Sequence, residues 1–425
     1  MTDESSDGGS KTILDSIIIF RGGSAISNDE LKAHLASLLR LENVGVLLGS
    51  GSSRGDLGGK TISDIWKEFV AKKKESYKWL IDESFVKKDE TPNLEDLFDV
   101  LEIAAKEWDR QGRSRRLKKL KSITNDLKKA VISGTLLREE FWSGDRSVWV
   151  EHGALENHRR LLQRLVSARQ AGQSAPWIFT TNYDLSIEWA AESIGLRITN
   201  GFEGLHQRIF APHSFDLGYH NLLARGEARF GAYNFNLVKL HGSLNWRKKE
   251  QDYIEVPVGM IWREIETFLK STDGNLDCPI VFPTAAKYIQ TVGFVLGELL
   301  RRFTDFLSRP QACLICSGYS FLDAHLNQII LRALQNPTLQ LVIYLPEAKK
   351  KDSGELDLDK CSAWVKKIRA LESAQVTIIG GGEAAHFERF VRMLPDPAIY
   401  DDQALRIRKT LKELEPPKAC EDVKQ

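Results

Sequence analysis

Short runs of consecutive apolar residues recur along the chain and alternate with stretches in which apolar residues are spaced three and four apart. The first pattern is typical of buried parallel strands and the second of amphipathic helices. Strands are expected at residues 44–48, 177–179, 237–240, 279–282, 313–316, 339–345 and 376–379. Alternating strands and helices predict an α/β fold with a doubly wound, mostly parallel, Rossmann-like sheet.

Residues 62–172 interrupt this alternation, because they carry only charge-rich helical patterns, clearest at 94–108 and 117–137. We expect a large helical insertion there, between the first two strands of the sheet. A shorter helix is expected at 28–41, with Asn28 as its N-cap. The predicted parts are a disordered N-terminus at 1–10, a sheet domain at 11–61 and 173–397, the helical insertion at 62–172 and a helical C-terminal tail at 398–425.

Composition is that of an ordinary soluble protein, with 42% hydrophobic and 28% charged residues and a net charge of +1 over 425 residues. Such a balance argues against a molecule built as a whole to bind nucleic acid or an anionic membrane. No apolar run approaches the roughly 20 residues that span a bilayer. We therefore expect a cytoplasmic protein.

The cysteines fit that compartment, since five widely spaced residues do not form a disulfide framework. Cys313 and Cys316 have the spacing of a metal or redox pair, but they lie inside a predicted buried strand. We interpret them as core residues and expect no metal site.

Polar residues that could bind a ligand or take part in catalysis follow several of the predicted strands. A glycine turn follows the first strand, and it contains Gly49, Ser50, Gly51 and Ser53. Such a turn lets backbone amides and the N-terminus of a following helix face a pyrophosphate, or it serves only as a structural turn. Dehydrogenase and P-loop patterns both require glycine at position 54, which is Arg54.

The next strand is followed by Thr181, Asn182 and Asp184. Asp184 on its own is explained as a helix cap, but that leaves Asn182 without a role. Asn182 and Asp184 are two residues apart on an extended segment, so their side chains point to the same side and could contact one ligand.

His241 closes a further strand, within Lys239-Leu240-His241-Gly242-Ser243. A histidine at a strand end is often a core or capping residue. Its ordinary pKa of about 6.5 also suits a general base near neutral pH. Ligands bind at the carboxyl ends of strands in open α/β sheets, which is where all these residues are predicted to lie.

Together these motifs resemble the sirtuin family, whose pocket cleaves the nicotinamide–ribose bond of NAD. The family's glycine turn matches Gly49, Gly51 and Ser53, and its T-x-N-x-D pattern matches residues 180–184, with Thr181 where glutamine is usual. Gly318 and Ser320 match the turn that contacts the adenosine ribose and phosphates. The K-L-H-G-S string and the string from Gly318 to Asn327 resemble bacterial sirtuin-like NADases of antiphage defence.

The resemblance implies that Asn182, Asp184 and His241 are catalytic. It implies NAD+ as a substrate rather than a permanently bound cofactor, and it assigns NAD+ binding to Gly49, Ser50, Gly51, Ser53, Thr181, Gly318 and Ser320. Deacetylating sirtuins carry a four-cysteine zinc ribbon between the histidine and the later turn, whereas only three cysteines occur there in this chain. Water is then the simplest acceptor, and the expected activity is NAD+ hydrolysis to nicotinamide and ADP-ribose.

In a defence setting this activity would deplete NAD and abort infection. It would be gated by homo-oligomerisation or by a separately encoded HerA-type ATPase. Two alternatives stay open: a sirtuin-type deacylase or ADP-ribosyltransferase, and a non-catalytic nucleotide-binding subunit of a nucleic-acid-directed complex. The basic run from Arg110 to Lys129 is either a nucleic-acid surface or, as we prefer, a solvated helix face.

Overall fold

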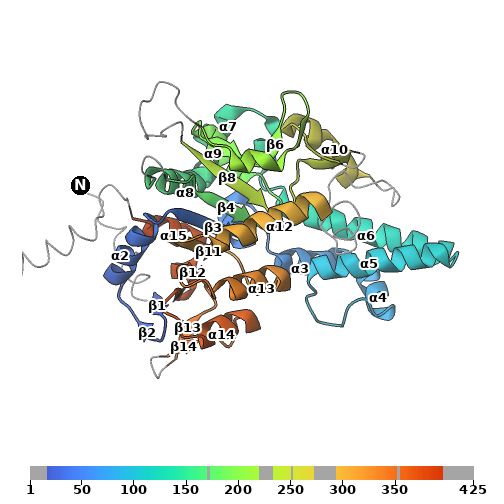
Figure 1. Ribbon diagram of the computed structural model, residues 1–425. Helices are drawn as coiled ribbons and strands as arrows, with labels where there is room; N and C mark the ends of the chain where they lie inside the picture. Colours follow the sequence, from blue (N-terminus) through green and yellow to red (C-terminus); the bar gives the residue numbers. More distant parts are fainter. Residues whose placement is uncertain are drawn as a thin grey trace, which may run out of the picture.

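A nine-stranded sheet runs through the computed structural model in the order β2-β1-β15-β12-β11-β3-β4-β8-β5 (Figure 1). The structure describes residues 17–169, 173–219, 233–249, 252–271, 293–351 and 355–395. The parallel strands are β3 (Asn43–Leu48), β4 (Trp177–Thr180), β5 (Arg197–Thr199), β8 (Asn234–Lys239), β11 (Ala312–Ser317), β12 (Gln340–Tyr344) and β15 (Val376–Gly380). The short strands β1 (Ile18–Arg21) and β2 (Ser24–Ala25) add an antiparallel edge beyond β15.

The chain order of the strands places a topological switch in the middle of the sheet. The chain passes from β3 outward through β4 to β8, and then returns to the other side of β3 to form β11, β12 and β15. Six strands therefore follow the order of the doubly wound dinucleotide-binding fold, and the crevice at the switch lies between β3 and β11. The predicted α/β fold with a mostly parallel sheet is confirmed.

Helices cover both faces of the sheet, because successive side chains in each strand point to opposite sides. In β4, Ile178 belongs to one hydrophobic core, and Trp177 and Phe179 belong to the other. One face packs against α12 (Gly293–Ser308), α13 (Ala324–Ala333) and α14 (Ala363–Ala370). The other face packs against α2 (Asn28–Leu38), α8 (Glu156–Ser167), α9 (Ser186–Ser193) and α15 (Phe387–Met393).

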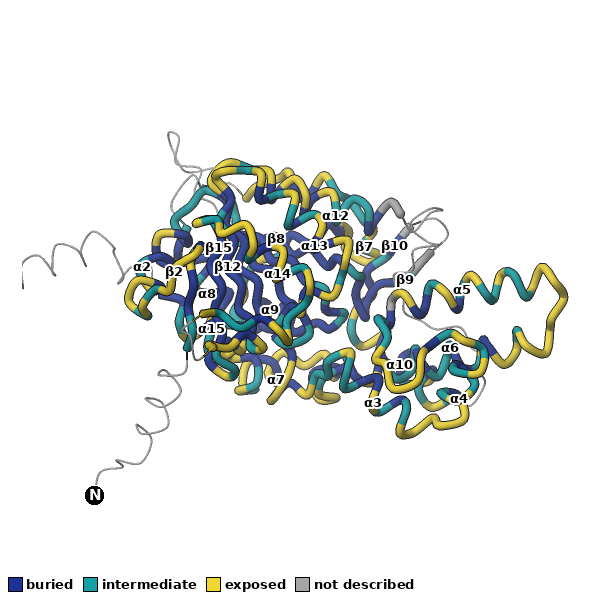
Figure 2. Tube along the Cα trace, turned by 90° about the horizontal axis from the view of Figure 1, so that it is seen from below, coloured by how far each residue is buried: buried dark blue, intermediate teal, exposed yellow. Residues whose placement is uncertain are grey.

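The described part of the connection from β3 to β4 contains only helices. They are α3 (Ile62–Lys72), α4 (Lys74–Asp82), α5 (Leu94–Arg110), α6 (Ser114–Thr135), α7 (Arg146–Glu151) and α8, with short 3-10 turns between them. Helices α5 and α6 pack side by side as a hairpin that extends from the rest of the molecule, as Figures 1 and 2 show. Helix α10 (Val258–Lys270) packs near the base of this region.

The structure adds elements that the sequence pattern did not predict. An antiparallel sheet follows the order β6-β7-β10-β9, with β6 (Phe202–Glu203), β7 (Arg208–Phe210), β9 (Trp246–Lys249) and β10 (Asp252–Glu255). A two-stranded sheet pairs β13 (Lys349–Lys350) with β14 (Leu356–Asp357). These strands are mostly two to four residues long, which is too short to show a clear period in the sequence.

One helix start differs from its prediction. The N-cap of α2 is Ser27, not Asn28, because the Ser27 side chain and Glu30 form a reciprocal capping box. The expected strand at 279–282, the N-terminal residues 1–10 and the tail at 398–425 lie outside the described residues. Within the described ranges, no helix combines the length and the apolar character needed to cross a membrane.

The turns that follow β3 and β11 touch through their backbones. The Gly51 amide donates to the Gly318 carbonyl at 3.0 Å, and a Cβ on Gly49 would lie only 2.4 Å from that same oxygen. Gly318 itself has φ +65°, a conformation that favours glycine. Glycine is therefore required at these positions for the contact between the two turns.

We predict that Gly51→Ala destabilises the protein by about 1–3 kcal/mol, because its Cβ would lie 2.7 Å from Gly318 Cα and force the turns apart. Chemical denaturation measures the loss. Gly297→Ala in α12 is the control: its Cβ meets no atom within 4 Å, so a gain of up to about 1 kcal/mol is expected. A similar shift in both variants would contradict the explanation.

A second prediction concerns two buried histidines. Burial lowers the pKa of His158 to about 4, although the nearby Asp184 acts in the opposite direction, and both ring nitrogens lack hydrogen-bond partners. Burial, followed by the charge of Arg21, lowers the pKa of His34 to about 4 as well. Between about pH 6.5 and 4 the unfolded chain binds more protons than the folded chain, so stability falls with falling pH.

Replacing His158 with Leu should make the stability lost between pH 7 and pH 5 smaller by about 2 kcal/mol. Denaturation at both pH values measures this difference. The exposed His206, changed to Gln, serves as the control and should leave the pH dependence as it is in the wild type. An unchanged pH dependence in His158→Leu would contradict the assignment.

Candidate functional site

A pocket opens at the switch point and collects residues from the ends of β3, β4, β8 and β11. It encloses about 970 Å³ of empty space, including its open mouth. The predicted site residues that line it are Gly49, Ser50, Ser53, Thr181, Asn182, Asp184, His241, Gly318 and Ser320. Gly51 does not line the pocket, because it packs against the Gly318 backbone instead.

The glycine turn differs from the expected arrangement. The sequence suggested that a helix N-terminus would face an anion there, but the residues after Gly49 form a 3-10 helix, η1 (Ser50–Ser53), and α3 begins only at Ile62. Backbone groups of a turn, rather than the end of an α-helix, therefore border this side of the pocket.

Asn182 is tied to the glycine turn. Its Nδ2 lies 3.0 Å from the Gly49 carbonyl oxygen, 3.2 Å from Ser52 Oγ and 3.0 Å from Ser53 Oγ. Because a carbonyl oxygen only accepts, the amide nitrogen must face the turn. The other amide atom, Oδ1, is the one left to accept a hydrogen bond from a ligand.

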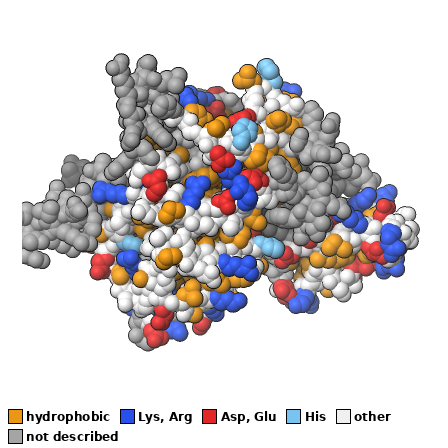
Figure 3. Space-filling view, viewed as in Figure 1, with side chains coloured by type: hydrophobic (Ala, Val, Ile, Leu, Met, Phe, Trp, Pro, Cys, Tyr) orange, Lys and Arg blue, Asp and Glu red, His pale blue; other side chains and the backbone are white. Residues whose placement is uncertain are grey.

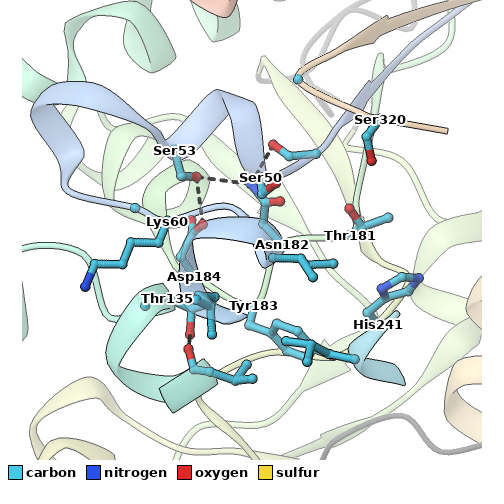
Figure 4. A pocket seen from close by; sticks show the side chains of 18 of the residues that line it. Ser50, Ser53, Lys60, Thr135, Thr181, Asn182, Tyr183, Asp184, His241 and Ser320 are labelled. Atoms are coloured by element: carbon cyan, nitrogen blue, oxygen red, sulfur yellow. Dashed lines mark hydrogen bonds between the residues drawn. The ribbon is translucent and has the colours of Figure 1, made fainter. Parts of the chain in front are cut away.

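Asp184 continues this network, as the dashed lines in Figure 4 show. Ser53 Oγ donates to Asp184 Oδ2 at 2.7 Å, and the Ser186 amide donates to Asp184 Oδ1 at 3.0 Å. Asp184 is therefore not the N-cap considered from the sequence, because that position is Leu185, but its carboxylate binds the first amide of α9 (Ser186–Ser193). With 6% of its surface exposed, this carboxylate depends on such donors to offset its loss of hydration.

A buried ion pair lies beneath the Asn182–Asp184 segment. Lys239 Nζ donates to Glu188 Oε1 at 2.9 Å and also contacts the carbonyl oxygen of Asp184. Burial raises the pKa of Glu188, although Lys239 opposes the shift. The lysine of the K-L-H-G-S string thus supports the backbone that carries the predicted catalytic side chains.

His241 lies at the end of β8, across the pocket from Lys60 (Figure 4). Its Nε2 lies 2.9 Å from Asp323 Oδ2. Burial tends to raise the pKa of Asp323, but the hydrogen bond and charge of His241 and two backbone amides outweigh it, so the pKa is lowered. The contact between Asp323 and His241 was not predicted from the sequence.

The loop after β11 is held by its own side chains. Tyr319 Oη donates to Asn327 Oδ1 at 2.9 Å, and Asn327 Nδ2 donates to the Phe321 carbonyl at 2.8 Å. Phe321 has φ +56°, which is unusual for an aromatic residue and costs on the order of 1 kcal/mol. Asn327 is fully buried, so the loop is fixed from beneath.

The remaining wall of the pocket comes from the helices of the β3–β4 connection, which the sequence did not connect with the site. Its members are Gly59, Lys60, Ile62, Ile65, Asn93, Leu94, Phe98, Val131, Gly134, Thr135 and Leu137. Most of them are apolar and belong to α3, α5 and α6 or to their flanks. Gly59 and Lys60 match the end of a P-loop pattern, but Arg54 stands where that pattern requires glycine.

Cys313 and Cys316 are fully buried in β11, on opposite faces of the sheet, which confirms that they are core residues. Burial raises the pKa of Cys313 to about 12 and raises that of Cys316 as well. In the ranges that the structure describes, no three His, Cys, Asp or Glu side chains are grouped as metal ligands.

The basic run lies on the α5–α6 hairpin, where Lys and Arg side chains mix with Asp and Glu (Figure 3). Its exposed members include Arg113, Arg115, Arg116, Lys118, Lys119 and Lys121. Arg116 pairs with Glu83 at 3.4 Å, and Arg110 pairs with Glu107 at 2.7 Å. Neighbouring carboxylates therefore partly compensate the positive charge.

Comparison with known proteins bears on this site. No curated protein matches the chain. The family model described as the SIR2-like domain matches residues 176–367. The matched segment includes Asn182, Asp184, His241, Gly318 and Ser320, whereas the glycine turn at 49–53 precedes it. The chain is thus similar to the SIR2-like domain over β4 to α14, and such a domain indicates an activity related to NAD.

Proposed function

We propose that this protein is an NAD+ glycohydrolase, which converts NAD+ and water into nicotinamide and ADP-ribose. The observation that carries the proposal is the gathering of Asn182, Asp184 and His241 with the glycine turn around one pocket at the switch point. The similarity to the SIR2-like domain supports NAD+ as the substrate.

The reaction breaks the bond between the nicotinamide nitrogen and the anomeric carbon of the ribose. The electron pair of that bond neutralises the pyridinium nitrogen, and the oxygen of water forms the new bond to the anomeric carbon. Water loses one proton in the step. The protein must therefore hold the dinucleotide, stabilise an electron-poor sugar and receive a proton.

Each of these tasks has a candidate in the pocket. The turn at Gly49–Ser53 and the Gly318–Ser320 turn border it from adjacent strands, and the hydroxyls of Ser50 and Ser320 are candidates to bind phosphates and ribose. Asp184 brings a buried negative charge, and Asn182 Oδ1 can accept a hydrogen bond from the attacking water. His241 is the candidate base, because its ring can accept a proton near neutral pH.

Water is the proposed acceptor because a peptide-binding zinc module is not evident in the sequence between His241 and Gly318. Only Cys278, Cys313 and Cys316 occur in that interval, and the last two are core residues of β11. An apolar wall from α3, α5 and α6 also borders the pocket. Transfer to a protein side chain is the alternative that product analysis would detect.

The proposal includes a gate, since unrestrained hydrolysis would exhaust the NAD of the cell. We assign that role to self-association or to a separately encoded partner such as a HerA-type ATPase, in an antiphage setting. This part of the proposal rests on the resemblance of the K-L-H-G-S and G-Y-S-F-x-D-x-H-x-N strings to defence NADases. Assays should therefore cover a range of protein concentrations, with and without DNA.

The decisive prediction is loss of nicotinamide release in His241→Ala, by about 10²–10⁴-fold, as expected for removal of a general base. Chromatography of nicotinamide and ADP-ribose from purified protein measures the rate. His206→Ala, at an exposed histidine outside this pocket, is the matched control and should retain the wild-type rate. Equal rates in wild type and His241→Ala would overturn the assignment.

Asn182→Ala should also abolish nicotinamide release, and it should reduce stability by about 1–3 kcal/mol. The second effect is expected because Nδ2 of Asn182 ties the β4 segment to the glycine turn. Thermal unfolding measured beside the assay separates the two effects. Full activity in a variant that has lost this stability would leave Asn182 with a structural role alone.

A further inference from the structure

The contact between His241 and Asp323 joins strands that are not neighbours. In the sheet, β3 and β4 lie between β11 and β8, so the two strand ends are separated by three strand spacings, roughly 14 Å. The loop after β11 nevertheless places Asp323 Oδ2 at 2.9 Å from His241 Nε2. This loop must cross the ends of two strands to make the contact.

The Asp323 carboxylate is held in one orientation. Its Oδ1 accepts from the amides of His325 and Leu326, at 2.8 and 3.0 Å, and so caps α13. These bonds leave Oδ2 directed at the imidazole. The buried Asn327, bonded to Tyr319 and to the Phe321 carbonyl, fixes the loop that precedes the cap.

We propose that Asp323 is a positioning residue that holds His241 with its proton on Nε2, so that Nδ1 carries the lone pair that accepts a proton from water. This inference rests on the proposed function. An ionised carboxylate only accepts hydrogen bonds, so the Nε2 that faces it carries the hydrogen. The tautomer is thus assigned from the hydrogen-bond partner.

The negative charge of Asp323 also stabilises the protonated form of the His241 ring. When Nδ1 takes a proton the ring becomes positive, and the Asp323 carboxylate then lies beside an imidazolium. Both side chains are largely buried, with 11% and 16% of their surfaces exposed, so this attraction is screened less than it would be in bulk water. The lowered pKa of Asp323 keeps the carboxylate ionised near neutral pH.

A capping role alone does not account for the geometry. Asp145 caps α7 in the ordinary way, since its Oδ1 accepts from the Ser147 amide at 2.9 Å and from the Ser147 hydroxyl at 2.8 Å. Those contacts stay within its own turn. At Asp323, by comparison, one oxygen caps the helix and the other reaches a residue 82 positions away.

The test compares Asp323→Asn with Asp145→Asn. Asparagine can keep either cap through its side-chain oxygen, but at position 323 it would present an NH2 group to Nε2 and favour the opposite tautomer. We expect kcat for nicotinamide release to fall by about 10²–10⁴-fold in Asp323→Asn, in line with the same substitution in catalytic triads. The KM for NAD+ should change less than about threefold, and Asp145→Asn should keep the wild-type kcat.

The pH profile separates positioning from stability. The described titratable side chains that border the same pocket are Lys60, Tyr183, Asp184, Tyr319 and Asp323. Among them, Asp323 pairs with the His241 ring at 2.9 Å. Because a neutral amide no longer favours the protonated ring, the acidic limb of kcat should move to lower pH in Asp323→Asn.

A second variant covers the case in which Asp323→Asn does not fold. Asp323→Ser keeps a capping hydroxyl that is too short to reach His241, and the same loss of kcat is expected. Wild-type kcat with an unshifted pH profile in either folded variant would overturn the inference.

Nitrogen-15 NMR of the full chain, with the His241 signal identified by His241→Ala, gives a readout that does not need activity. We expect Nε2–H in the wild type and Nδ1–H in Asp323→Asn. An inactive wild type with the Nε2–H tautomer would count against the proposed function, whereas an active wild type with the Nδ1–H tautomer would refute the role of Asp323.

Discussion

The candidate site depends on the backbone contact between the turns that follow β3 and β11. Diverging connections leave a crevice at this switch point, and the contact of Gly49 and Gly51 with Gly318 sets how closely its two sides approach. Side chains would hold the turns apart, since a Cβ at either position would lie within 2.7 Å of this backbone. The polar residues of the pocket take their positions from these two turns.

The two turns organise the two halves of the site differently. Next to the β3 turn, Asn182 bonds to Gly49 and to Ser53, and Ser53 bonds to Asp184, so the amide and the carboxylate are fixed by neighbouring strands. Next to the β11 turn, Asp323 contacts His241 across the carboxyl ends of the strands between β11 and β8. Buried polar groups are costly unless bonded, and these bonds both offset that cost and restrict movement.

Much of the fold and of the candidate site could be predicted from the sequence, because the strands and the residues at their ends follow short local patterns. Apolar runs located the central strands, and the polar residues directly after them, such as Asn182 and His241, had to lie at one edge of a parallel sheet. The Asp323–His241 pair could not be predicted, since local pattern does not give the path of a loop across two strands. The helical wall around Phe98 and Thr135 was missed for the same reason, as amphipathic spacing shows that a helix has a buried face but not what that face covers.

That wall gives the pocket two chemically different ends, which fit the proposed reaction. The side formed by Gly49, Ser50 and Ser320 is polar and carries two hydroxyl groups that suit a charged pyrophosphate. The side formed by Ile62, Ile65 and Phe98 is apolar. In the proposed reaction, cleavage would turn a cationic pyridinium into neutral nicotinamide, so an apolar surface would favour the product of bond breaking over the charged ground state. The buried Asp184 would offset the positive charge that develops on the sugar. The helices between β3 and β4 are therefore part of the proposed chemistry, although their sequence carries no catalytic motif.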